Sequence, residues 1–369
     1  MYRICYWLVA STLFFILGCT DEKHETIEKG VFRTVIVYMV ADNDLSVNAY
    51  ENIDKIVEGV TSIMGNNKIL IYLDPVDTPQ LIEISYLNGR KNIKTIRDYP
   101  EQNSLDSTIM RSVLLEIIDK YPSESYGLVL WSHGTSWLPP NSVLKSFGDD
   151  NGKEMDILLL EQSLPLKFEF IIFDACLMGS IEVAYQFRNK ANYILSSPTE
   201  VLSTGYPYDL IVSDFFGGVE EFKNIAFSFF AYYNSQNGAY QSASVSLIGT
   251  KRLDCLAEKS KSMLANWPIE KWTFTTQFVQ NFDVGNSNLT YDYIDFLDKN
   301  YPSCMVNEIK LVFDEIIIVK YHTPNFLEKI SITRFCGLGC YVPNHLYSGI
   351  NQYYRRLAWY ADAGYEVLF

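Results

Sequence analysis

The sequence predicts an α/β fold in which a mostly parallel central sheet carries helices on both faces. Several runs of β-branched, aromatic and aliphatic residues are apolar along their whole length, as in strands buried on both faces. Stretches with apolar residues at helical spacing separate these runs, and this alternation favours parallel strands joined by crossover helices. The 369 residues and the hydrophobic fraction of 48% allow a sizeable core and exclude a mainly disordered chain.

The expected elements follow in chain order, and the apolar runs of the first half are the clearest. Buried strands are expected at 33–40, 68–73, 127–131, 168–173 and 191–195. Amphipathic helices are expected from about Leu45 to Val60 and from Leu105 to Ile118. The alternating segment Gln80–Leu87 is expected to be an edge strand.

The pattern weakens after about Gly238. A strand at 243–248 and a helix reaching Trp267 are expected there, followed by a helix at 291–298 and a strand at 337–342. The segment 310–321 is apolar, but its pattern does not distinguish a helix from a strand. No internal repeat or low-complexity linker separates the two halves, so the second half is expected to complete the first or to pack on it.

The N-terminus resembles the export signal of a bacterial lipoprotein. Arg3 is followed by an apolar segment, 4–17, that is short for a transmembrane helix and typical of a signal peptide. The signal ends in Ile16-Leu17-Gly18-Cys19, which resembles a lipobox and makes Cys19 the expected lipid carrier. The acidic tether after it resembles the surface-export signal of Bacteroides-type lipoproteins. We therefore expect a cell-envelope lipoprotein of the outer membrane, and the acidic tether indicates that it is surface-exposed. An ordinary secretory signal cleaved elsewhere, or an apolar anchor, is the alternative.

Charge and cysteine content restrict the remaining possibilities. Thirty Lys and Arg face 44 Asp and Glu, and a net charge of −14 argues against a nucleic-acid partner. Seven cysteines are an odd number, so at least one is unpaired, removed or modified. No role is assigned to four of them, and their disulfide pairing stays open: Cys255, Cys304, Cys336 and Cys340.

Two predicted strands end in residues that could form a nucleophilic pair. His133 follows the strand at 127–131, and Cys176 follows the strand at 168–173. The carboxyl ends of neighbouring parallel strands meet at one edge of a sheet, where α/β proteins bind ligands. An adjacent imidazolium lowers the pKa of a thiol, and a helix starting near Leu177 would lower it further. Considered alone, Cys176 is more commonly interpreted as an inert buried cysteine and His133 as a structural histidine.

The segments Trp131-Ser132-His133-Gly134 and Asp174-Ala175-Cys176-Leu177-Met178-Gly179 resemble those of clostripain-type cysteine peptidases (peptidase family C11), which belong to the caspase-like clan. The resemblance covers about residues 34–210 and implies a caspase-like three-layer α/β/α sandwich with a smaller C-terminal extension. Together with the N-terminal signal, it divides the chain into a signal peptide (1–18), a flexible tether (19–30), a catalytic domain (31–237) and a C-terminal region (238–369).

The resemblance also implies roles for individual residues. Cys176 would be the nucleophile of an endopeptidase, and His133 its general base and acid. The backbone N–H groups of Gly134 and Cys176 would bind the oxyanion. Asp174 matches the acid at the floor of the first specificity pocket and implies cleavage of peptides or proteins after Arg or Lys, although it could instead cap the nucleophile loop. The family's second acid has no clear match in 201–205.

Two further properties of the family bear on this chain. Some members cleave themselves between His and Cys, and Lys145 is the better candidate here, with Lys153 the other. Some members respond to Ca²⁺, and segment 148–152 is acidic and turn-like but lacks the spacing of a calcium loop. The resemblance implies no required cofactor, and whether this chain responds to Ca²⁺ stays open.

Two other functions are compatible with the same residues. A catalytically inactive surface binding or adhesion protein of the same fold is the main alternative. An amidase or transpeptidase that uses the same His–Cys pair is a third possibility.

Overall fold

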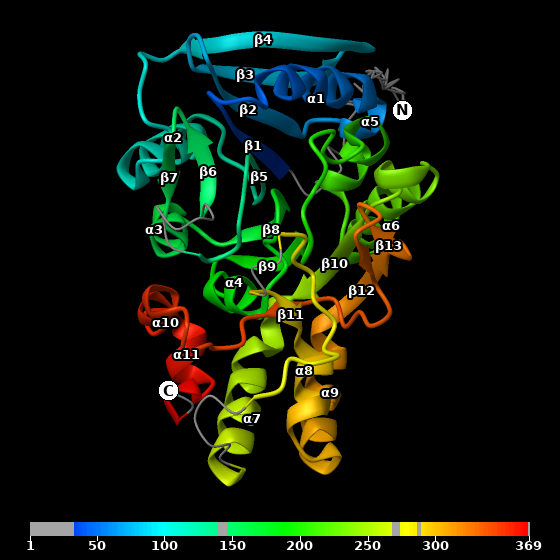
Figure 1. The fold of residues 1–369 in the computed structure, drawn as a ribbon. Coiled ribbons are helices and arrows are strands. Elements are labelled where there is room, and N and C mark those ends of the chain that lie inside the picture. The colour runs from blue at the N-terminus through cyan, green and yellow to red at the C-terminus, as the bar shows by residue number, and fades with distance from the viewer. Residues whose placement is uncertain (1–32, 139–145, 268–273, 286–288, 368–369) are drawn as a thin grey trace, which may run out of the picture. The chain divides into compact units, whose positions relative to one another are not determined.

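A nine-stranded sheet organises the computed structural model, which describes residues 33–138, 146–267, 274–285 and 289–367 (Figure 1). In spatial order the strands are β12 (Ile317–His322), β10 (Ser244–Gly249), β9 (Ala191–Ser196), β8 (Phe168–Asp174), β5 (Ser125–Trp131), β1 (Arg33–Ala41), β2 (Lys68–Pro75), β3 (Gln80–Leu87) and β4 (Arg90–Asp98). The five central strands, from β9 to β2, are parallel to one another. They are the five apolar runs of the sequence.

Antiparallel strands extend the sheet at both ends. β3 and β4 lie at one end, and β10 and β12, which come from the region after residue 238, lie at the other (Figure 1). The prediction of β3 as an edge strand was wrong, because β4 covers it. β4 is rich in Lys and Arg and mostly exposed, so it has no apolar alternation by which to be predicted.

Helices cover both faces of the sheet and bury two apolar clusters. One cluster takes Val35, Val37 and Met39 of β1, and the other takes Ile36 and Tyr38, so successive side chains of the strand enter opposite layers. The first layer contains α1 (Ser46–Gly59), α5 (Tyr208–Ile211) and α6 (Val219–Asn234). The second contains α2 (Ser107–Lys120), α3 (Ile157–Ser163), α4 (Ile181–Gln186), α7 (Leu253–Asn266), α8 (Tyr293–Asn300), α9 (Ser303–Ile316), α10 (Ser348–Tyr354) and α11 (Ala358–Asp362). The predicted α/β/α sandwich is confirmed.

Three short strand pairs lie outside the large sheet in the described part of the chain. They are β6 (Phe147–Asp150) with β7 (Lys153–Met155), β11 (Tyr291–Asp292) with β15 (Gly339–Cys340), and β13 (Asn325–Phe326) with β14 (Ile330–Ser331). The apolar segment 310–321 spans the end of α9 and most of β12, which explains why no single periodicity fits it. The expected strand at 337–342 is reduced to the two residues of β15.

Two observations concern the expectations made for cysteines and membranes. The five cysteines in the part of the chain that the structure describes are all free thiols, so Cys336 and Cys340 do not form a disulfide. Within the same ranges, no helix has the length and apolar character needed to cross a bilayer. Cys19 and Lys145 lie outside the described residues.

Candidate active site

Adjacent parallel strands place the two reactive residues at one edge of the sheet. β5 pairs with β8, and Trp131 at the end of β5 lies opposite Asp174 at the end of β8. The chain continues from these ends into His133 and Cys176. The backbones remain in contact: a Cβ built on Gly134 would lie 2.8 Å from the Cys176 carbonyl oxygen and 3.2 Å from its nitrogen. Only a residue without a side chain fits there.

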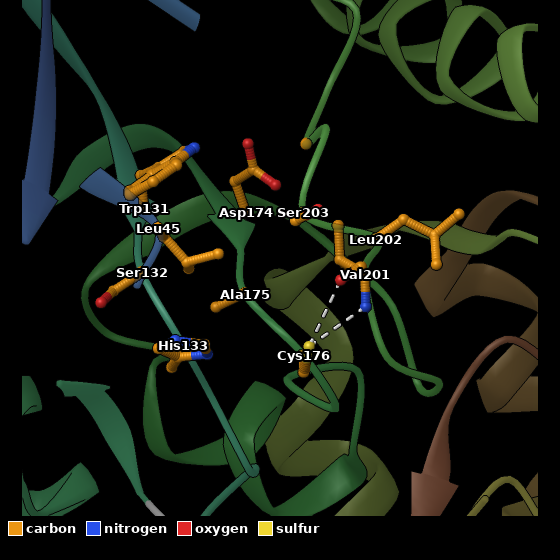
Figure 2. A pocket seen from close by; sticks show the side chains of 11 residues that line it. Leu45, Trp131, Ser132, His133, Asp174, Ala175, Cys176, Val201, Leu202 and Ser203 are labelled. Atoms are coloured by element: carbon orange, nitrogen blue, oxygen red, sulfur yellow. Dashed lines mark hydrogen bonds between the residues drawn. The ribbon is translucent and has the colours of Figure 1, made fainter. Parts of the chain in front are cut away.

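A cavity of about 140 Å³ opens at this edge and brings together His133, Cys176 and Asp174. Its lining residues are Leu45, Trp131, Ser132, His133, Asp174, Ala175, Cys176, Val201, Leu202, Ser203 and Gly205. Figure 2 shows His133 and Cys176 toward one end of the pocket and the Asp174 carboxylate toward the other. The cavity therefore contains a thiol, an imidazole and a buried acid in one space.

A carboxylate from the connection between β1 and α1 contacts the imidazole of His133. Its Nε2 lies 2.7 Å from Asp44 Oδ1, and its side chain is 31% exposed. Its carbonyl oxygen accepts a hydrogen bond from the Gly148 N–H at 2.9 Å, which fixes the backbone. Asp44 lies in the β1–α1 connection, where the segment Ala41-Asp42-Asn43-Asp44 predicts a turn and a helix N-cap. Sequence reasoning therefore missed the partner of the imidazole.

Cys176 is hydrogen-bonded to the backbone of Val201, which passes over it. Its S–H donates to the Val201 carbonyl oxygen at 3.4 Å, and the Val201 N–H donates to Sγ at 3.3 Å (Figure 2). Burial raises the pKa of the thiol to about 12, and the negative charges of Glu200 and Asp174 also raise it. In this resting arrangement the sulfur is paired with Val201 rather than activated by an imidazolium.

The expected helix N-terminus at the nucleophile is absent from this position. Leu177 has φ 63°, in the left-handed region, so the chain cannot enter a helix there. α4 begins at Ile181, with the Ser180 hydroxyl accepting a hydrogen bond from the Val183 N–H at 3.2 Å. The expectation of a helix starting near Leu177 was therefore wrong, because the helix after Cys176 begins only at Ile181.

Asp174 both lines the cavity and holds the loop that closes it. Its Oδ2 accepts hydrogen bonds from the Tyr208 hydroxyl at 2.7 Å and the Tyr206 N–H at 3.2 Å. Burial raises the pKa of the carboxyl to about 6, although these hydrogen bonds lower it. Gly205 has φ 66°, and a Cβ there would lie 2.7 Å from Asp174 Oδ2, so glycine is required. Tyr206 and Tyr208, which stand in a segment that resembles the family's loop after the next strand, thus position the acid.

Among the described residues that line this pocket, Asp174 supplies the one carboxylate. Val201, Leu202 and Ser203 line the wall where the family resemblance implies a second acid. The segment 148–152 comprises most of β6 and the turn into β7, with φ 48° at Asn151 and 82° at Gly152. The pocket contains no grouping of acids that would bind a metal.

A cysteine and a histidine that follow adjacent parallel strands of an α/β/α sandwich define the class of caspase-like cysteine hydrolases. The clostripain family model, Peptidase_C11, matches residues 37–312. This chain belongs to the clostripain family, and the predicted class of cysteine peptidase is confirmed. Clostripain of Hathewaya histolytica is 26% identical over 223 residues, 48% of this chain and 41% of clostripain. The match thus spans less than half the length of that relative.

Solved structures extend the similarity to nearly the whole chain. A secreted C11 cysteine protease from Bacteroides thetaiotaomicron, in complex with an irreversible peptide inhibitor, is 30% identical. It superposes with a TM-score of 0.81 over 90% of this chain and 99% of its own. An inactive zymogen C11 protease from Parabacteroides distasonis is 29% identical, with a TM-score of 0.79 over 90% of this chain and 97% of its own. The caspase-like fold is thereby confirmed.

Proposed function

We propose that this chain is a cysteine endopeptidase in which Cys176 is the nucleophile and His133 the general base and acid. The observation that supports this most directly is the shared cavity, in which both side chains lie beside a buried acid. The contact between the backbones of Gly134 and Cys176 supports it further, because it brings two N–H groups to the edge where a substrate carbonyl would bind.

The proposed reaction needs only these groups and water. His133 takes the thiol proton, and the Cys176 thiolate attacks the carbonyl carbon of the scissile peptide. The carbonyl oxygen becomes an oxyanion, which the N–H groups of Gly134 and Cys176 stabilise. The intermediate collapses to a thioester, and the leaving amine takes the proton from His133. Water, deprotonated by His133, then hydrolyses the thioester and restores the thiol.

The geometry described here corresponds to a resting enzyme. The thiol must leave Val201 and turn toward His133 before the imidazole can accept its proton. An imidazolium beside the sulfur then favours the thiolate and opposes the effect of burial on its pKa. We propose that self-cleavage after Lys145 promotes this change. The Parabacteroides relative was solved as an inactive zymogen, which is consistent with a regulated resting state in this family.

Asp174 is the proposed determinant of substrate preference. Its buried carboxylate lines the pocket and can accept charge-assisted hydrogen bonds from a guanidinium or an ammonium group. We therefore propose cleavage after Arg or Lys. Because Leu202 and Ser203 occupy the neighbouring wall instead of an acid, we expect the preference over neutral residues to depend on Asp174 alone.

We also propose that the protein is exported and anchored in the cell envelope through a lipid on Cys19, in the outer membrane. Labelling of the wild-type chain with a radioactive fatty acid, and its loss in Cys19→Ala, would support this. Recovery of unlabelled wild-type protein in the soluble fraction would contradict it.

The endopeptidase activity is tested with three otherwise identical fluorogenic peptides that carry Arg, Lys or Gln before the scissile bond. Wild type is expected to cleave the Arg and Lys peptides, and Cys176→Ala is expected to lose this cleavage. Cys304→Ala is the matched control, because Cys304 is an exposed free thiol with no place in the pocket. Equal cleavage by wild type and Cys176→Ala would contradict the proposal. Absent cleavage with an unreactive Cys176 would favour a binding protein of the same fold.

A further inference from the structure

The contact between Asp44 and His133 depends on a turn at the surface of the protein. Asp44 Oδ1 lies 2.7 Å from His133 Nε2, yet the Asp44 side chain is 83% exposed. An exposed pair of this kind holds neither partner firmly, because side-chain entropy and solvent compete with the contact. The position of the carboxylate is therefore set by the backbone of the connection between β1 and α1.

Asn43 fixes that backbone on both sides of Asp44. Its Oδ1 accepts the Leu45 N–H at 2.8 Å, and its carbonyl oxygen accepts the Ser46 N–H at 3.2 Å. These two hydrogen bonds close a turn around Asp44 directly before α1 begins. The orientation of the carboxamide follows from its partners, because the Leu45 N–H only donates and the partners of Nδ2 are carbonyl oxygens, which only accept.

The amide nitrogen of Asn43 joins this turn to β6. Its Nδ2 donates to the carbonyl oxygen of Asp149, in β6, at 2.6 Å. It also donates to the carbonyl oxygen of Val40, near the end of β1, at 3.2 Å. The side chain thus spans from the end of β1 to β6 and holds the turn against both strands.

The same strand β6 holds the segment that carries His133. The Gly148 N–H donates to the His133 carbonyl oxygen, and the Asp149 N–H donates to Ser132 Oγ at 3.3 Å. The Ser132 hydroxyl in turn donates to the Val40 carbonyl oxygen at 2.8 Å. Because β6 is bonded to the histidine segment and to Asn43, it sets the position of the imidazole and of the turn with its carboxylate relative to each other.

We propose that Asn43 is a positioning residue of the peptidase, which acts on His133 through Asp44. The side chain contacts neither the thiol nor the imidazole, and it joins the turn around Asp44 to the strand that holds His133. Asparagine suits this position because it accepts from the turn and donates to β6 at once. The inference rests on the proposed function, since it needs His133 as the general base.

The test measures kcat and KM for an Arg peptide, with kcat expressed per active site titrated by an irreversible electrophilic-ketone peptide. Asn43→Ala is expected to lower kcat about two- to tenfold with KM unchanged, and by no more than Asp44→Ala does. Asn43→Ser keeps an oxygen that can accept the Leu45 N–H, but its side chain is too short to reach Asp149. It is therefore expected to lose as much kcat as Asn43→Ala.

Asn103 provides the matched control, because it closes the same kind of turn before α2. Its Oδ1 accepts the Leu105 N–H at 3.0 Å, and its carbonyl oxygen accepts the Asp106 N–H at 3.0 Å. Asn103→Ala removes the same local side-chain contact from a turn that contains no partner of His133, and it is expected to keep the kcat of the wild type. An equal loss of kcat in Asn103→Ala and Asn43→Ala would overturn the proposal.

A double-mutant cycle separates positioning from an independent structural role. In the Asp44→Ala chain, Asn43→Ala is expected to change kcat less than about 1.5-fold, because residues that act through one another are not additive. If Asn43→Ala does not fold, Asn43→Ser replaces it in the cycle.

Two further results would overturn the positioning role. They are a wild-type kcat in Asn43→Ala or Asn43→Ser, and the same fold loss of kcat with and without Asp44. Failure of the proposed function looks different, because Cys176→Ala would then retain cleavage. An inactive Cys176→Ala chain together with a normal kcat in Asn43→Ala would remove the role of Asn43 alone.

Discussion

Replacing Asp174 with Asn is expected to stabilise the protein while it weakens recognition of basic substrates. Burial moves the pKa of this carboxyl from 3.8 to about 6, so keeping it ionised in the folded state costs about 3 kcal/mol. Asn has nearly the same shape but accepts less well from Tyr206 and Tyr208, which reduces the gain to about 1–3 kcal/mol. The lost charge-assisted contact with Arg or Lys is expected to lower kcat/KM about 10–150-fold.

Urea unfolding at several pH values tests the stability part of this prediction, with Cys176→Ala as the background for both chains. The folded-state pKa of Asp174 lies above the unfolded value, so the folded wild type takes up a proton as pH falls from about 6 to 4. The advantage of Asn should therefore be complete above pH 6 and disappear near pH 4. A destabilised Asp174→Asn chain at pH 7.5, or unchanged kcat/KM for Arg and Lys peptides in the active background, would refute the reasoning.

Three further substitutions test the rest of the pocket. Gly134→Ala should lower kcat at least about 100-fold, because the added Cβ would lie 2.8 Å from the Cys176 carbonyl oxygen and displace the backbone. A kcat equal to that of the wild type would exclude this close contact. Ser203→Asp adds an acid to the pocket wall and should raise kcat/KM for Arg relative to Gln peptides about tenfold, whereas an unchanged ratio would show that this wall does not contact the basic side chain. Asp44→Ala should lower kcat about two- to tenfold with KM unchanged, since it only orients His133, and a rise in KM alone would argue against that role.

The sequence predicted the site best where an apolar run leads directly into a reactive residue. The apolar runs before His133 and Cys176 had to be strands buried on both faces, and parallel pairing then brings their ends together. The structure places both residues in one cavity for that reason. Gly134 was singled out as a donor to the oxyanion, and that role stays a prediction; the structure adds a separate reason for glycine there, its close contact with the Cys176 backbone.

Other parts of the site depend on contacts between residues far apart in the chain, which local patterns do not encode. Asp44 had the sequence context of a turn, and only the packing of the β1–α1 connection brings it to His133. Val201 is an ordinary apolar residue whose backbone, not its side chain, holds the thiol.

Covalent labelling tests the central claim most directly. A peptide that ends in Lys and carries an electrophilic ketone is incubated with the wild type, His133→Ala and Cys304→Ala, and the modified residue is identified by mass spectrometry. We predict a single adduct on Cys176 in the wild type and in Cys304→Ala, and a much slower reaction in His133→Ala. Modification of another cysteine, or equal labelling of Cys176 without His133, would contradict a His133–Cys176 pair.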